Sequence, residues 1–145
     1  MADFADEFKT HLKTISDVTT LVGTGTSARI YPDMLRQGCT LPAIIYYETG
    51  GESWEYLGGI GGLRHTVMHV VAYGATRAAA NELADTIRTK ALNANFKGDM
   101  GTTHVSGINA SEARSTGVDR SDDKSDTKRY WCDRIYDLYH VEATS

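Results

Sequence analysis

The pattern of apolar and polar positions is most regular between residues 41 and 73, where two runs rich in β-branched and aromatic residues flank a glycine-rich segment. The runs cover residues 41–49 and 63–73. The four glycines within residues 58–62 can adopt the positive φ angles that a reversing loop needs. Apolar side chains occur on both faces of each run, because odd and even positions are equally hydrophobic. The sequence therefore predicts a long antiparallel hairpin in a sheet that is covered on both sides.

Two longer segments have helical periodicity. Residues 4–15 place Phe4, Phe8, Leu12 and Ile15 on one stripe, and a second apolar stripe runs through residues 80–91 after a candidate N-cap at Thr76. Residues 16–22 suit a further short helical turn capped by Ser16 or Asp17, and residues 29–32 suit a short extended piece. The two long segments predict amphipathic helices, each with one buried face.

The second half of the chain predicts two more strands. Residues 103–110 form a weaker apolar run, residues 115–128 have the Ser, Asp, Gly and Lys content of a surface loop, and residues 130–141 alternate with aromatics on both faces. In the last run Cys132, Tyr136 and Leu138 share one face. The predicted fold is a single α+β domain over residues 1–145, with a mainly antiparallel four-stranded sheet and two helices packed on one face.

Two helices cover only one face of such a sheet, so apolar surface is left on the other. Exposed apolar area of this kind usually marks an interface, and the pattern therefore predicts self-assembly. Alternatively, the glycine-rich hairpin arm and the N-terminal segment fold over the second face. The interface candidates are Tyr46, Trp54, Gly58, Gly59, Ile60, Gly61, Arg120, Lys124, Trp131 and Tyr136.

Amino-acid composition and net charge limit the classes of protein to which the chain can belong. The chain has 41% hydrophobic and 23% charged residues, as globular domains do, and a net charge of −4 gives no basic field for nucleic acid. It contains neither a run long enough to span a membrane nor the basic and apolar start of a signal peptide, so we expect a protein made in the cytosol. Cys39 and Cys132 are expected to be free thiols.

The sequence offers no convincing catalytic or cofactor site. His65 and His69 have the spacing of a helical zinc motif, but on a strand they lie about 13 Å apart, too far for one ion. Residues 23–28 imitate a dinucleotide loop without the preceding strand. Residues 112–137 mix seven acidic with six basic side chains, which favours salt links between subunits over a nucleic-acid footprint. We expect no cofactor and no bound metal.

Several short segments, in their order and spacing, resemble the tail-completion or tail-terminator family of tailed bacteriophages and gene transfer agents. They are residues 29–32 (Arg-Ile-Tyr-Pro), residues 41–46 (Leu-Pro-Ala-Ile-Ile-Tyr), the loop that ends at Gly62 before residues 70–73, the helix after Thr76, and the aromatic strand through Tyr136 and Tyr139. Residues 100–128 fit the pattern least well.

The resemblance implies a structural virion protein of the neck and not an enzyme. It implies a ring, typically of six subunits, at the head-proximal end of the tail tube, where the ring ends tube growth and joins the tail to the head connector. The implied partners are further copies of the chain, the tail tube protein, the connector or stopper protein, and genomic DNA that passes through the lumen without sequence readout. The protein would be made in the host cytoplasm and end in the virion.

Two alternatives remain open at this stage. One is a head-side adaptor or stopper of the neck, which the sequence does not separate from a terminator. The other is a small ligand-binding or enzymatic α/β domain that uses His65, His69 and nearby glutamates.

Overall fold

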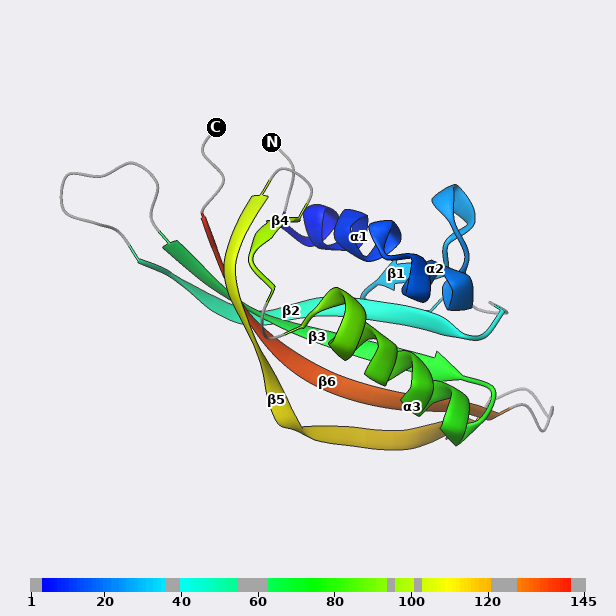
Figure 1. Cartoon of the computed structure of the whole chain (residues 1–145). Coiled ribbons are helices and arrows are strands. Elements are labelled where there is room, and N and C mark those ends of the chain that lie inside the picture. The colour runs from blue at the N-terminus through cyan, green and yellow to red at the C-terminus, as the bar shows by residue number, and fades with distance from the viewer. Residues whose placement is uncertain are drawn as a thin grey trace.

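The computed structural model describes residues 4–35, 40–54, 63–93, 96–100, 103–120 and 128–141. These residues form one curled sheet with helices on one of its faces (Figure 1). The helices are α1 (Phe4–Thr14), α2 (Ser16–Val22) and α3 (Arg77–Thr86), which continues into a π-helical turn (Ile87–Ala91). The strands are β1 (Ile30–Pro32), β2 (Ala43–Trp54), β3 (Leu63–Gly74), β4 (Gly98–Met100), β5 (Thr103–Arg120) and β6 (Lys128–Val141).

The α+β class is confirmed, but the prediction of four strands and two helices is wrong in detail. The described sheet has six strands in the order β1-β2-β3-β6-β5-β4, and all neighbours are antiparallel except β1 and β2. Strand β1 lies within residues 29–32, whose expected extended conformation is confirmed, whereas β4 was not expected. Each of these strands has three residues, too few to produce a readable alternation. Residues 16–22 form a helix as expected, although its N-cap is Ile15, which makes no side-chain capping bond.

The prediction of a loop from residue 115 is also wrong in part. Strand β5 continues to Arg120, and its last residues pair with the start of β6 as far as Arg120 and Lys128. The polar composition of residues 115–118 misled the prediction because three of these four residues are exposed, and an exposed strand needs no apolar side chains. Residues 121–127 lie outside the described part of the chain.

Burial along β6 shows which face the helices cover. Its even-numbered residues from Cys132 to His140 are all buried, and its odd-numbered residues from Trp131 to Tyr139 are half-buried or exposed. The buried face of the sheet joins the apolar stripes of α1, α2 and α3 in one core. Cys132, Tyr136 and Leu138 therefore share one face, as predicted, and that face is the core face.

Helix α3 packs closely against the end of β3. The Thr76 side chain accepts a hydrogen bond from the Ala79 N–H, so the predicted N-cap is confirmed. A side chain at Gly74 would lie 2.6 Å from the backbone nitrogen of Ala80. Only a glycine allows this approach, and it fixes where the helix begins over the sheet.

Helix α1 is tied to the end of the π-helical turn by a buried histidine. The Nε2–H of His11 donates to the carbonyl oxygen of Ala91 at 2.8 Å, and the imidazole also packs on Phe96 with ring centroids 4.9 Å apart. Burial lowers the pKa of His11, while the hydrogen bond to Ala91 opposes this shift. Phe96 thus packs against the core.

Candidate functional site

The sheet face opposite the helices, called the open face below, is the most distinctive surface of the molecule. Within the described residues the three helices all lie on the other face (Figure 1). The open face carries the odd-numbered side chains of the central strands β3 and β6 and, as far as Tyr47, those of β2, whose register shifts after Glu48. Its apolar and aromatic members include Ile45, Tyr47, Val67, Val71, Tyr73, Trp131, Ile135 and Tyr139.

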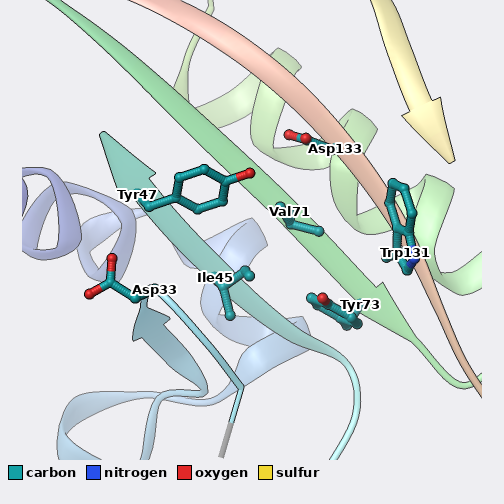
Figure 2. A pocket seen from close by; sticks show the side chains of 7 residues that line it. All are labelled: Asp33, Ile45, Tyr47, Val71, Tyr73, Trp131 and Asp133. Carbon is teal, nitrogen blue, oxygen red and sulfur yellow. The ribbon is translucent and has the colours of Figure 1, made fainter. Parts of the chain in front are cut away.

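An open pocket of about 440 Å³ lies on this face. Figure 2 shows its lining residues on β2, β3, β6 and the residue after β1: Asp33, Ile45, Tyr47, Val71, Tyr73, Trp131 and Asp133. Ile45 and Val71 are directly paired across β2 and β3 and form the apolar floor. Tyr47, Tyr73 and Trp131 supply the aromatic walls. The pocket therefore combines three rings with two carboxylates.

Asp33 reaches the pocket from an unusual backbone conformation. Its φ angle is +67°, in the left-handed region, which asparagine and aspartate tolerate better than most residues. Its N–H donates to the carbonyl oxygen of Tyr46 at 3.0 Å, so the backbone is anchored to β2 while the side chain is exposed. The carboxylate is held at the rim without being buried.

Asp133 lies deeper and belongs to a three-residue cluster. The Nδ1–H of His69 donates to the two carboxylate oxygens of Asp133 at 3.2 and 3.1 Å, and the ring of Tyr47 stacks on His69 with centroids 4.7 Å apart. Burial and the nearby charge of Asp133 raise the pKa of Tyr47, so its hydroxyl stays protonated at neutral pH. The cluster is a fixed polar wall next to the apolar floor.

A second cluster of a histidine, an aspartate and a tyrosine lies further along strands β3 and β6. The Nε2–H of His65 donates to Asp137 at 2.7 Å, and Tyr139 stacks on His65 with centroids 4.8 Å apart. In both clusters the carboxylate comes from β6 and is diagonal to the histidine of β3. The open face thus combines apolar residues with half-buried histidine–aspartate pairs.

The structure shows where His65 and His69, which have the spacing of a helical zinc motif, lie. His65 and His69 both lie on strand β3, not on a helix, and each is engaged with its own aspartate. Among the described residues there is no group of three or more metal-ligating side chains. The histidine–aspartate pairs were not predicted, because they depend on the register of β3 against β6, which the spacing within one strand does not reveal.

Trp131 is positioned by a glycine on the neighbouring strand. Gly117 pairs with Trp131 across β5 and β6, and a side chain at Gly117 would lie 2.4 Å from the Cζ2 atom of the indole. The indole therefore lies flat over Gly117, where its other side faces the pocket. Ile135, which is 36% exposed, continues the apolar surface further along β6.

The structure places the predicted interface residues in three different environments. Trp131 lies on the open face, but Tyr46 and Tyr136 are 3% and 1% exposed and lie in the core beneath the helices, so their expected exposure is corrected. Trp54 and Arg120 end strands β2 and β5. The remaining candidates, Gly58, Gly59, Ile60, Gly61 and Lys124, lie outside the described residues.

Other predicted features have structural roles. Gly23 ends α2 with a φ of +95° and its N–H bonds back to Thr19, so residues 23–28 are a helix end and a 3₁₀ turn, not a nucleotide loop. Cys132 is buried and is not part of a disulfide, as expected, and Cys39 lies outside the described residues. None of the described helices is long and apolar enough to cross a membrane.

Comparison with known families gives the decisive observation. The sequence model of the family described as "Tail completion protein gp17" matches residues 9–130, most of the chain. The chain belongs to this family. Tail completion proteins are structural proteins of phage virions and not enzymes, so the enzymatic alternative raised by the sequence is set aside and the resemblance seen in its short segments is confirmed.

A solved structure supports the fold. The chain is similar to a chain of the structure titled "Virion of native gene transfer agent (GTA) particle", with a TM-score of 0.54 and 16% sequence identity over 93% of this chain and 92% of that chain. At this identity the likeness concerns the fold. No curated protein sequence matches the chain.

Proposed function

We propose that this tail completion protein forms a ring of six subunits on the head-proximal end of the tail tube. The observation that supports the proposal is the open face, where one side of the sheet lacks a helical cover in the described residues and carries aromatic and aliphatic side chains and histidine–aspartate pairs. Apolar surface of this kind on a small protein is usually buried by a partner. The sequence resemblance to the tail-completion family is the reason for proposing a ring and for placing it at the end of the tail tube.

A ring requires two different patches on each subunit. The open face is one patch, and the helix-covered side or a sheet edge of the neighbouring subunit is the other. Such a contact is heterologous, and its rotation must close for the assembly to stop at a ring instead of a filament. The described strands that end the sheet, β1 and β4, pair only with residues 44–46 of β2 and residues 103–105 of β5. Within the described residues, the remaining outer edges of the long strands β2 and β5 are therefore available to pair with a neighbouring subunit.

The ring would end growth of the tube and offer its opposite surface to the head connector. Genomic DNA would pass through the lumen without sequence readout, since the net charge of −4 gives the subunit little affinity for phosphates. The segments 58–62 and 121–127, which connect long strands, are the proposed contacts with the tube or the connector.

The experiment is a tube-growth assay with the tail tube protein and the isolated head connector of the same particle. Purified chain is added at increasing ratios while tubes polymerise, and tube lengths and gold-labelled chain are recorded by negative-stain electron microscopy. We expect shorter tubes with label at one end only. Label along the whole tube, or unchanged lengths with label only on isolated connectors, contradicts termination, and the second result identifies the head-side adaptor instead.

A further inference from the structure

Two long strands of the sheet have outer edges that are only partly covered. Strand β1 pairs with residues 44–46 of β2, and β4 pairs with residues 103–105 of β5. Among the residues that the structure describes, no strand pairs with the outer edge of residues 49–54 in β2 or of residues 106–120 in β5. Every second residue of such an edge turns its N–H and C=O groups outward, where a strand of another chain can pair with them.

The second half of β5 lacks the features that usually protect an exposed edge. Proteins interrupt such edges with prolines, bulges or charged side chains. Both register shifts of β5 lie before Arg114, and residues 114–120 pair with residues 128–134 of β6 without interruption. They contain no proline, and residues 115–118 carry no charge. Figure 1 shows this half of β5 at the lower margin of the sheet, so its outer edge is suited to pairing with another strand.

The directions of the strands favour β2 of a second copy as the partner. The pairs β2–β3, β3–β6 and β6–β5 are all antiparallel, so β2 and β5 run in opposite directions. A second copy that continues the sheet beyond β5 with the same face outward therefore places its β2 antiparallel to β5. The two edges are different patches, and each copy uses both of them, as a repeated heterologous contact requires.

The charges of the two edges are also complementary. Residues 114–120 contain two arginines and one aspartate, and Lys128 and Arg129 lie beside them at the start of β6. Residues 47–54 contain two glutamates and no basic residue. Opposite charges on paired strands stabilise a sheet, and like charges destabilise it. Pairing of β5 with β5 of a second copy would bring two basic segments together and leave the edge of β2 unpaired.

The positions of the two edges along the sheet agree with a closed assembly. Residues 50–54 of β2 lie level with residues 137–141 of β6, whereas residues 114–120 lie level with residues 128–134. Pairing them displaces each copy along the strands by roughly 20–25 Å. This displacement is similar to the width of the four long strands, roughly 20 Å, and corresponds to a strand tilt of roughly 45°, as in closed barrels.

We infer that the second half of β5 pairs with residues 49–54 of β2 in a neighbouring copy of the same chain, so that one sheet crosses the boundary between the subunits. This inference rests on the proposed ring and specifies the contact that sets the direction and the spacing of its subunits. The backbone hydrogen bonds of this contact add to the side-chain contacts of the open face.

The first test is amide hydrogen exchange, read by mass spectrometry on the purified chain. Exchange is compared between a concentration at which the chain is single and one at which it has assembled. We expect residues 49–54 and 114–120 to exchange roughly tenfold or more slowly in the assembled protein. Helix α2 is the internal control, because the inferred contact leaves its exchange unchanged.

The second test replaces single residues of the β5 edge by proline, in Ser115→Pro and Thr116→Pro. The N–H groups of adjacent residues point to opposite sides of a strand, so one variant loses a donor to β6 and the other loses a donor on the outer edge. Thermal unfolding distinguishes them, because only the first loses a hydrogen bond within the subunit. We expect the variant that keeps the wild-type unfolding temperature to need roughly tenfold more protein for assembly.

The outcomes separate this inference from the proposed function. Assembly with unchanged exchange in both segments, or full assembly of the stable proline variant, overturns the inference and leaves the ring intact. Slower exchange of residues 114–120 alone overturns β2 as the partner and identifies pairing of β5 with β5. Slower exchange of both segments in a series of growing masses supports the pairing and contradicts the closed ring. A chain that stays single at every concentration contradicts both.

Discussion

At the scale of single residues, Gly117 and His11 determine how the open face and the core are built. Gly117 leaves the space in which the indole of Trp131 lies, so a residue with no side chain shapes the wall of the pocket. His11 joins α1 to the end of the π-helical turn by a single buried hydrogen bond. Each of these roles depends on a partner far away in sequence, and each can be tested by substitution.

Replacing Gly117 by alanine forces the indole of Trp131 away from β5, because the new Cβ atom would be 2.4 Å from Cζ2. We expect a loss of roughly 1–3 kcal/mol in the free energy of unfolding and a changed Trp131 fluorescence spectrum. Gly107→Ala is the matched control, since nothing lies within 4 Å of a Cβ atom there on the same strand. Equal behaviour of the two variants in urea denaturation would show that Trp131 does not lie over Gly117.

The buried imidazole of His11 makes stability depend on pH. Its pKa is below 6.5 in the folded chain, so the unfolded chain binds the proton more readily. The contribution of His11 is therefore complete above pH 6.5 and is lost as the pH falls toward the lowered folded-state pKa. In urea denaturation from pH 8 to pH 5, the stability advantage of wild type over His11→Gln should shrink as the pH falls.

The control for this pH series is His104→Gln, because the His104 side chain is 56% exposed. Its difference from wild type should vary much less with pH than that of His11→Gln. An advantage of wild type over His11→Gln that grows toward pH 5 would contradict the buried neutral imidazole.

At the scale of elements, the success of prediction from the sequence depended on the length of each helix or strand and on whether its side chains are buried or exposed. The long helices and most of the long strands were predicted because their apolar periods run over several repeats. The alternation in β6 separated its two faces correctly but did not show which face is buried, since Tyr136 was expected at an interface and lies in the core. Strands β1 and β4 are too short for a period. Residues 115–120 were missed because an exposed strand can be polar throughout.

The candidate site was harder to predict than the fold. The period of β2 places Tyr46 and Tyr47 on opposite faces, but it does not say which face the helices cover, so Tyr46 was expected at the surface and lies in the core. The pairs of His65 with Asp137 and His69 with Asp133 join residues more than 60 positions apart. They follow from the register of two strands, which no local pattern contains.

The start of α3 provides a test at the element scale. Thr76→Ala removes the acceptor for the Ala79 N–H, and we expect a loss of about 1 kcal/mol in the free energy of unfolding. The control is Thr20→Ala, whose hydroxyl donates to the Ser16 carbonyl within an already hydrogen-bonded helix. A loss at Thr20 as large as that at Thr76 would mean that the measured effect is not due to capping.

At the scale of the whole molecule, the layered fold and the family membership lead to the same conclusion. The described helices cover one face of the sheet, and the other face carries aromatic rings, an apolar floor and aspartates. Membership in the tail completion family supplies a structural role in the virion. A subunit with one such face is suited to burying it against its neighbours, and a closed ring does so for every copy at once.

The most direct test is the mass of the purified chain in solution, measured by light scattering over a wide range of concentrations. The account predicts that single chains of 15.9 kDa give way to one discrete species of about six subunits as the concentration rises. A single-chain mass at every concentration, or a continuous series of growing masses, would contradict the closed ring on which the account depends.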